Sequence, residues 1–168
     1  MKTTAQRLAD QVREQIGSGK ALLDQAGDNA SAVFGVPSDV LSVKGNVADV
    51  GLTNHLWLLD LVNGGIFDRN QLESALNVAR PSTTDEAIAF LEPRDTFNAE
   101  EALAALDMVN EDLAALVEDL EDDVLDKNVD MTFYGRMTVA DLLFIVITHG
   151  ALHLGQGWGI LKAMGQAD

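Results

Sequence analysis

Four stretches of the sequence place apolar residues three and four positions apart, which is the period of an α-helix buried along one face. These stretches run roughly over 4–25, 46–62, 99–122 and 138–163. Signals for strands are weak, because β-branched residues rarely alternate with polar ones and no such run has a hairpin turn beside it. The periodicity therefore predicts an all-α protein built on four long helices.

Residues that favour helix ends refine these boundaries. Asn46, Asn98 and Thr138 are the predicted N-caps of the last three long helices, because their side chains can accept a hydrogen bond from a free backbone N–H. A short helix is predicted over about 84–92, and a loop over 126–136. The result is a four-helix bundle with a long middle connection, formed by a single domain over residues 1–168.

Composition excludes several classes of function. The chain has no cysteine, which excludes disulfides, thiolate metal sites and a cysteine nucleophile. Its net charge of −16 repels phosphate backbones, so we expect no binding of nucleic acid. The start of the chain is polar, and the longest strongly apolar run, 142–147, is far shorter than the roughly 20 residues that span a bilayer. We therefore predict a cytoplasmic protein without membrane contact.

All three histidines fall on predicted inward faces. His55 lies on the second long helix, and His149 and His153 are one turn apart on the fourth, so their rings stack on one side of it. A single histidine on an apolar face is usually an ordinary hydrogen-bonded core residue. Three of them would cost a few kcal/mol each if they were buried without partners, and binding one ion would remove that cost. His55, His149 and His153 are therefore the predicted metal ligands.

An all-imidazole site suits a divalent transition metal, with zinc or nickel favoured and iron an option. Three protein ligands leave a position open, as in catalytic sites. Gly150 follows the first histidine of the pair, where a zinc protease of the HExxH type needs glutamate, so that class is disfavoured. Gln156 lies three residues beyond His153 and is a candidate for contact with a ligand or cofactor, or for an ordinary polar role.

The stretch 138–156 resembles the signature of the DinB/YfiT superfamily, with two histidines four residues apart followed closely by Gly155-Gln156. The stretch 46–55 is similar to the family's second helix. The resemblance implies a four-helix bundle, often a homodimer, that binds a divalent metal through His55, His149 and His153. Some members, such as mycothiol-dependent maleylpyruvate isomerase and related thiol S-transferases, use the metal to activate a low-molecular-weight thiol.

Two hypotheses follow. The first is a metal-dependent enzyme, either a hydrolase or a thiol-dependent S-transferase, that activates water or an external thiol at an open site and acts on a small-molecule substrate. The thiol would have to be external, such as mycothiol, bacillithiol or glutathione, because the chain has no cysteine. The second is a non-catalytic binding or interaction bundle in which the metal is structural or absent.

Overall fold

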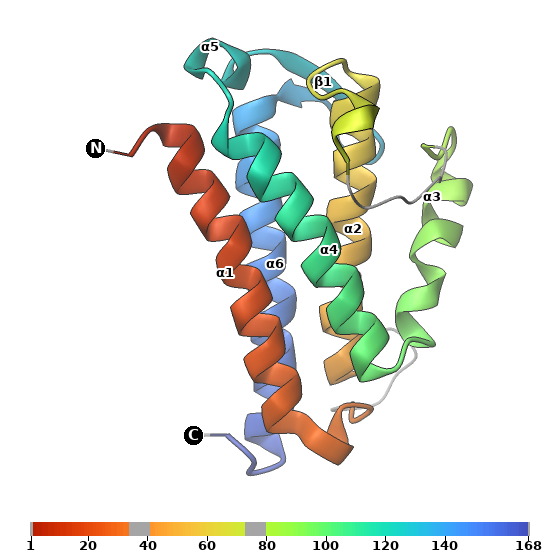
Figure 1. Ribbon diagram of the computed structural model, residues 1–168. Coiled ribbons are helices and arrows are strands. Elements are labelled where there is room, and N and C mark those ends of the chain that lie inside the picture. The colour runs from red at the N-terminus through yellow and green to blue at the C-terminus, as the bar shows by residue number, and fades with distance from the viewer. Residues whose placement is uncertain (1, 34–40, 73–79, 168) are drawn as a thin grey trace.

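The computed structural model describes residues 2–33, 41–72 and 80–167, which form a bundle of four long helices (Figure 1). These helices are α1 (Thr4–Ala26), α2 (Val43–Asn63), α4 (Ala99–Glu118) and α6 (Val139–Ala163). α1 packs mainly against α4 and α6, and α2 packs mainly against the same two helices, so α1 and α2 occupy opposite corners. The predicted all-α bundle is confirmed.

Side-chain caps set the starts of the long helices. Asn98 and Thr138, both predicted as N-caps, accept hydrogen bonds from the backbone N–H groups of Glu101 and Asp141. Asn98 is part of a reciprocal capping box, because the Glu101 side chain also accepts from the backbone N–H of Asn98. These two helix starts follow from local sequence alone.

The predicted start of α2 at Asn46 is wrong. Ser42 is the N-cap, and its hydroxyl accepts a hydrogen bond from the backbone N–H of Gly45 at 3.0 Å. Asn46 lies inside the helix, where its side-chain amide donates to the carbonyls of Leu41 and Ser42 at 3.2 and 2.9 Å. Both residue types cap helices well, and the one nearer the loop does so here.

The segment between α4 and α6 differs from the prediction as well. α4 ends at Glu118 instead of near residue 122, and the short helix α5 (Asp122–Leu125) follows. The predicted loop contains an antiparallel hairpin of β1 (Asn128–Met131) and β2 (Gly135–Thr138). Its strands have four residues each, too short to give a clear alternating pattern.

The described parts of the middle connection include segments that pack against α2. They contain two 3-10 helices, η2 (Arg69–Gln71) and η3 (Glu92–Asp95), with α3 (Thr84–Leu91) between them, and a further 3-10 helix, η1 (Gly27–Asn29), follows α1. Arg80 binds the fully buried Asp60 of α2, with 2.5 Å between Nε and Oδ1. Thr132 of the hairpin donates its backbone N–H to the same carboxylate at 2.9 Å. Asp60 thus links both the middle connection and the hairpin to α2.

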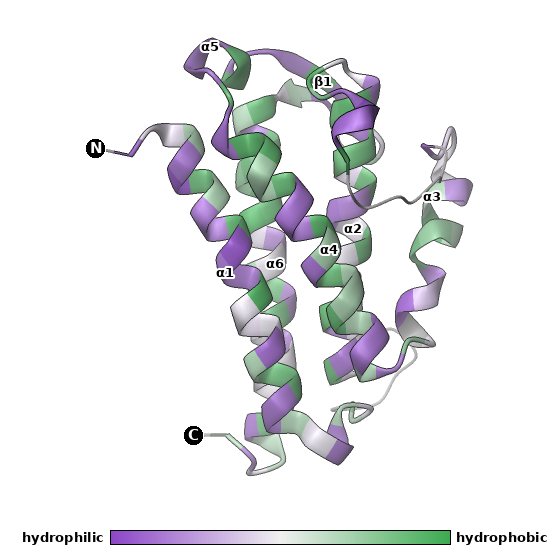
Figure 2. Ribbon diagram, viewed as in Figure 1, coloured by the Kyte–Doolittle hydropathy of each residue, from purple (hydrophilic) through white to green (hydrophobic). Residues whose placement is uncertain are grey.

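A buried polar layer divides the apolar core into two clusters. Asn54 donates to Asn110 at 2.8 Å and to Gln15 at 3.2 Å, and Gln15 donates to the carbonyl of Val146 at 3.1 Å, so the layer joins all four long helices. A Cβ at Gly150 would lie 2.3 Å from Nε2 of Gln15, so a larger residue there would displace the Gln15 side chain from this layer. Figure 2 shows polar and apolar residues along every long helix, as expected for helices with one buried face.

Within the described residues, α6 is long and apolar enough to cross a membrane, judged only by length and composition. Core helices of bundles pass the same test, and α6 packs here against α1 and α2. The helix is therefore weak evidence for a membrane span, and the cytoplasmic location stays a prediction.

Candidate metal centre

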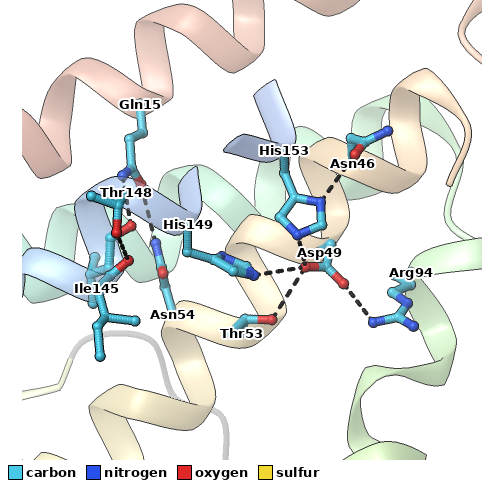
Figure 3. Close-up of polar contacts among 11 residues, drawn as sticks. Gln15, Asn46, Asp49, Thr53, Asn54, Arg94, Ile145, Thr148, His149 and His153 are labelled. Atoms are coloured by element: carbon cyan, nitrogen blue, oxygen red, sulfur yellow. Dashed lines mark hydrogen bonds and ion pairs between the residues drawn. The ribbon is translucent and has the colours of Figure 1, made fainter. Parts of the chain in front are cut away.

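Three potential metal ligands converge between α2 and α6. Asp49 comes from α2, and His149 and His153 come from successive turns of α6 (Figure 3). Both histidines direct Nε2 at Oδ2 of Asp49, each at 3.3 Å, and the two ring centroids are 4.4 Å apart. One ligand atom from each residue lies within 4.8 Å of the others. The sequence spacing brings the two rings together, and the packing of α2 against α6 adds the carboxylate.

The tautomer of His153 determines which of its ring nitrogens has a lone pair available for a metal. Its Nδ1 lies 3.0 Å from Oδ1 of Asn46. The Asn46 side chain is oriented without ambiguity, because its nitrogen already donates to two backbone carbonyls. Nδ1 of His153 must therefore carry the proton that this hydrogen bond needs. A neutral ring then presents the lone pair of Nε2 to the Asp49 carboxylate.

Two acceptor atoms thus face each other across 3.3 Å at the centre of the site. Burial lowers the pKa of His153 below its ordinary value, although the Asp49 charge opposes this, so the neutral ring is favoured at pH 7. A cation between Nε2 and Oδ2 would remove the repulsion. Metal-binding histidines usually donate their second ring N–H to an acceptor, as His153 does to Asn46. The residues therefore fit a metal ion.

Asp49 is held as a carboxylate. Its side chain is 4% exposed, and burial alone would raise its pKa. Interactions with His149, His153 and Arg94, above all the hydrogen bond from His149, outweigh burial and hold the pKa of Asp49 below its ordinary value. Arg94 donates from Nη1 to Oδ1 at 2.6 Å, which leaves Oδ2 facing the histidines. Thr53 adds a long contact of 3.5 Å to Oδ2.

One carboxylate oxygen and two imidazole nitrogens form a donor set that zinc, nickel and iron accept. The group Asp49, His149 and His153 could therefore bind a metal. Because three protein ligands do not fill a tetrahedral or octahedral shell, at least one position would remain for water or another ligand.

The site opens into a cavity of about 690 Å³, a size typical of small-molecule pockets. Trp57 forms one wall and meets the His149 ring edge-on, with centroids 5.1 Å apart. Phe133 and Tyr134, from the turn between β1 and β2, are part of its lining. The cavity thus combines a polar floor with aromatic walls.

A sequence model of the DinB superfamily matches residues 36–156, which is more than half of the chain. The chain belongs to the DinB superfamily. The match includes α2, η3 and most of α6, and so covers Asp49, Arg94, His149 and His153. No curated protein and no solved structure matches the chain significantly.

The structure of this DinB protein does not bring His55 to the other two histidines. Six residues at about 100° each place His55 roughly 120° around α2 from Asp49, so the two point to different neighbours. His55 is 3% exposed and meets the Phe90 ring edge-on at 5.2 Å. It lines a second cavity, of about 540 Å³, together with Gly51 and Met108. Asp49 takes the place in the cluster that the sequence analysis gave to His55.

The surroundings of His55 keep its ring neutral. Burial lowers its pKa to about 4, and the charge of Arg69 adds to this effect while that of Asp112 opposes it. This is the environment of a core histidine. Metal binding by His149 and His153 stays a prediction, as does contact between Gln156 and a ligand, although Gln156 does line the cavity of the metal cluster.

Sequence reasoning missed Asp49, although a signal existed. Asn46, Asp49 and Thr53 are polar residues three and four positions apart on one side of a mainly apolar helix. Such a stripe on a buried helix indicates a polar partner on the neighbouring element. The sequence analysis placed the face of α2 that carries His55 toward α6. Periodicity assigns residues to a face of a helix, but it does not show which neighbouring helix that face contacts.

Proposed function

We propose that this DinB protein is a metal-dependent enzyme that acts on a small-molecule substrate. Asp49, His149 and His153 would hold a divalent transition metal, with zinc or nickel favoured and iron as a further option. The ion would supply Lewis acidity and lower the pKa of a water or of an external thiol. The observation that carries the proposal is the pair of acceptors, Nε2 of His153 and Oδ2 of Asp49, that face each other at 3.3 Å beside an open cavity.

Other residues of the chain orient the metal ligands and line the cavity. Asn46 fixes the tautomer of His153, and Arg94 orients Asp49 so that one oxygen faces the histidines. Apolar side chains in the cavity wall, such as Leu91 and Ile160, limit access of water. Any thiol nucleophile must come from outside, because the chain has no cysteine; mycothiol, bacillithiol and glutathione are the candidates.

A homodimer in the cytoplasm is part of this proposal. Phe144 and Leu152 are two helical turns apart on α6 and are 64% and 57% exposed. Large apolar side chains at this spacing on one face of a helix support contact with a second copy. We include no nucleic-acid or membrane partner, and the net charge of −16 supports this for nucleic acid.

Metal affinity of matched variants tests the ligand set. Purified protein is stripped with a chelator and titrated with Co²⁺, Ni²⁺ and Zn²⁺ by calorimetry. We expect Asp49→Ala and His153→Ala to bind on the order of 100-fold more weakly than the unaltered chain, because each loses a ligand. His55→Ala is the matched control and should bind as the unaltered chain does. Equal affinity in Asp49→Ala, or an equal loss in His55→Ala, would contradict the proposed site.

The non-catalytic alternative has one observation in its favour, since an ion at this site would join α2 to α6. Thermal unfolding separates the two roles. A structural ion stabilises the fold strongly, so its removal should lower the Tm by well over 10 °C. We expect a drop of only a few degrees, because Arg94 and Asn46 already hold the ligands in place. A large drop would favour the alternative.

A further inference from the structure

The charge of the metal-site cavity differs from that of the whole chain. Acidic residues outnumber basic ones by 27 to 11 in the sequence. Among the described residues that line the cavity, and apart from its histidines, the charged ones are Asp49 and Arg94, one of each sign. A divalent ion would therefore give the cavity an excess of about two positive charges. The acidic exterior would surround a pocket that attracts anions.

Arg94 has hydrogen-bond donors beyond the one that binds Asp49. Its side chain is 33% exposed and lines the cavity, and its Nη1 donates a hydrogen bond to Asp49. Its Nε is buried and has no partner among the described residues. A guanidinium has five N–H donors in a fixed plane, and one of them serves Asp49. The group therefore keeps donors for a second planar anion.

The rest of the cavity wall suits an apolar body. Leu41, Leu91 and Ile160 line it together with Phe133 and Tyr134. Phe133 is 38% exposed and Tyr134 54%, and the Tyr134 ring lies 6.2 Å from the ring of Trp57, so part of each side chain is open to contact with a ligand. A cavity of about 690 Å³ has room for a ring and a short chain.

We propose, on the basis of the proposed function, that the substrate is a carboxylate attached to an apolar or aromatic body, and that Arg94 binds its carboxylate. The planar fork of Arg94 matches a carboxylate better than a tetrahedral anion. Because Asp49 offsets the charge of Arg94, the positive excess that attracts the carboxylate comes from the ion. An amine would be repelled by Arg94 and by the ion. A neutral analogue would fill the apolar walls but would lose the charged hydrogen bonds.

Three probes with the same body test this specificity. The zinc-loaded protein is titrated by calorimetry with 3-phenylpropionate, 3-phenylpropionamide and 3-phenylpropylamine, after its zinc content has been measured. We expect the carboxylate to bind at least about tenfold more tightly than the amide, because hydrogen bonds to charged groups gain roughly that much. The amine should bind most weakly. Equal binding of carboxylate and amide would overturn the inference.

Variants of Arg94 separate its contribution from that of the ion. Because Arg94 also orients Asp49, the variants are compared at equal zinc content. Arg94→Gln should then weaken binding of the carboxylate about tenfold and leave binding of the amide within about twofold. Arg94→Lys should keep part of the preference, because it retains the charge without the planar fork. Arg136→Gln, at an exposed position on β2 outside the cavity lining, is the control and should change neither.

The outcomes distinguish this inference from the function on which it rests. If Arg94→Gln takes up zinc and binds the carboxylate as tightly as the unaltered chain does, Arg94 is not the anion site, while the metal centre stands. If the unaltered chain takes up no zinc, nickel or cobalt, the proposed function itself is contradicted, and the inference falls with it.

Discussion

The two sides of α2 lie beside different cavities, and the neighbours of their polar residues differ. One side carries Asn46 and Asp49 into a cavity shared with α6, where Asn46 contacts His153 and Asp49 contacts both His149 and His153. The other side carries Gly51 and His55 toward α4, where the neighbours in the second cavity are mostly apolar. The first side contacts His149 and His153, and the second carries His55. Among the described residues, only the first forms a cluster of potential metal ligands.

The difference shows that the partners of a histidine, more than its burial, indicate its role. His153 has a fixed proton on Nδ1 and a carboxylate in front of Nε2. His55 meets an aromatic edge instead, and burial simply keeps it neutral. Four experiments on α2 test how separate its two sides are, and they follow from the largest expected effect to the smallest.

The pH dependence of stability should report on His55. Above about pH 6.5 the folded and unfolded chains both hold the neutral ring. Between about 6.5 and the folded pKa of about 4, only the unfolded chain takes up a proton, so stability falls as the pH falls through this window. The loss attributable to His55 should approach about 3 kcal/mol.

Urea unfolding of the unaltered chain and of His55→Gln at pH 7, 6, 5 and 4 measures this loss. The difference in stability between the two should change by about that amount across the series, because other titrating groups are common to both. A constant difference would show that His55 is not in the apolar environment described.

Gly51 sets how closely α2 approaches α4. A Cβ there would lie 2.7 Å from the backbone nitrogen of Leu106, and backbone cannot move aside as a flexible side chain can. We expect Gly51→Ala to lower the free energy of unfolding by about 2 kcal/mol. Gly155→Ala is the control, because its Cβ would have nothing within 4 Å, and alanine in a helix should stabilise by up to about 1 kcal/mol. Similar effects of the two changes would refute the close approach.

Asn46 should matter for metal binding on the other side of the helix. Asn46→Ala removes the acceptor that fixes the proton of His153 on Nδ1, and loss of such a partner typically weakens metal affinity 10- to 100-fold. Because this variant also loses hydrogen bonds to Leu41 and Ser42, circular dichroism should first confirm that it is folded. Unchanged Co²⁺ affinity in a folded variant would contradict the tautomer assigned to His153.

Thr53 should have the smallest effect. Its hydroxyl lies 3.5 Å from Oδ2 of Asp49, at the limit of a hydrogen bond, and Arg94 already orients the carboxylate. Thr53→Val keeps the shape of the side chain, and metal affinity should stay within about twofold of that of the unaltered chain. A tenfold loss in calorimetric titration would place Thr53 among the groups that support the site.

Local pattern accounts for most of the fold. The apolar period located the four long helices, and side-chain capping located the starts of α4 and α6. Errors arose where two signals competed or where the element was short. Ser42 and Asn46 are both good caps within one turn of each other, and the hairpin strands are too brief for a period to be visible.

The sequence by itself determined the bundle and the stacking of His149 on His153, because both depend on the geometry of single helices. Only the tertiary structure decided that Asp49, and not His55, meets those rings, since this depends on how α2 is rotated between α4 and α6. That rotation follows from the summed packing of many side chains, including the contact at Gly51 and the layer of Gln15, Asn54 and Asn110. A local sequence pattern does not show the combined result of this packing.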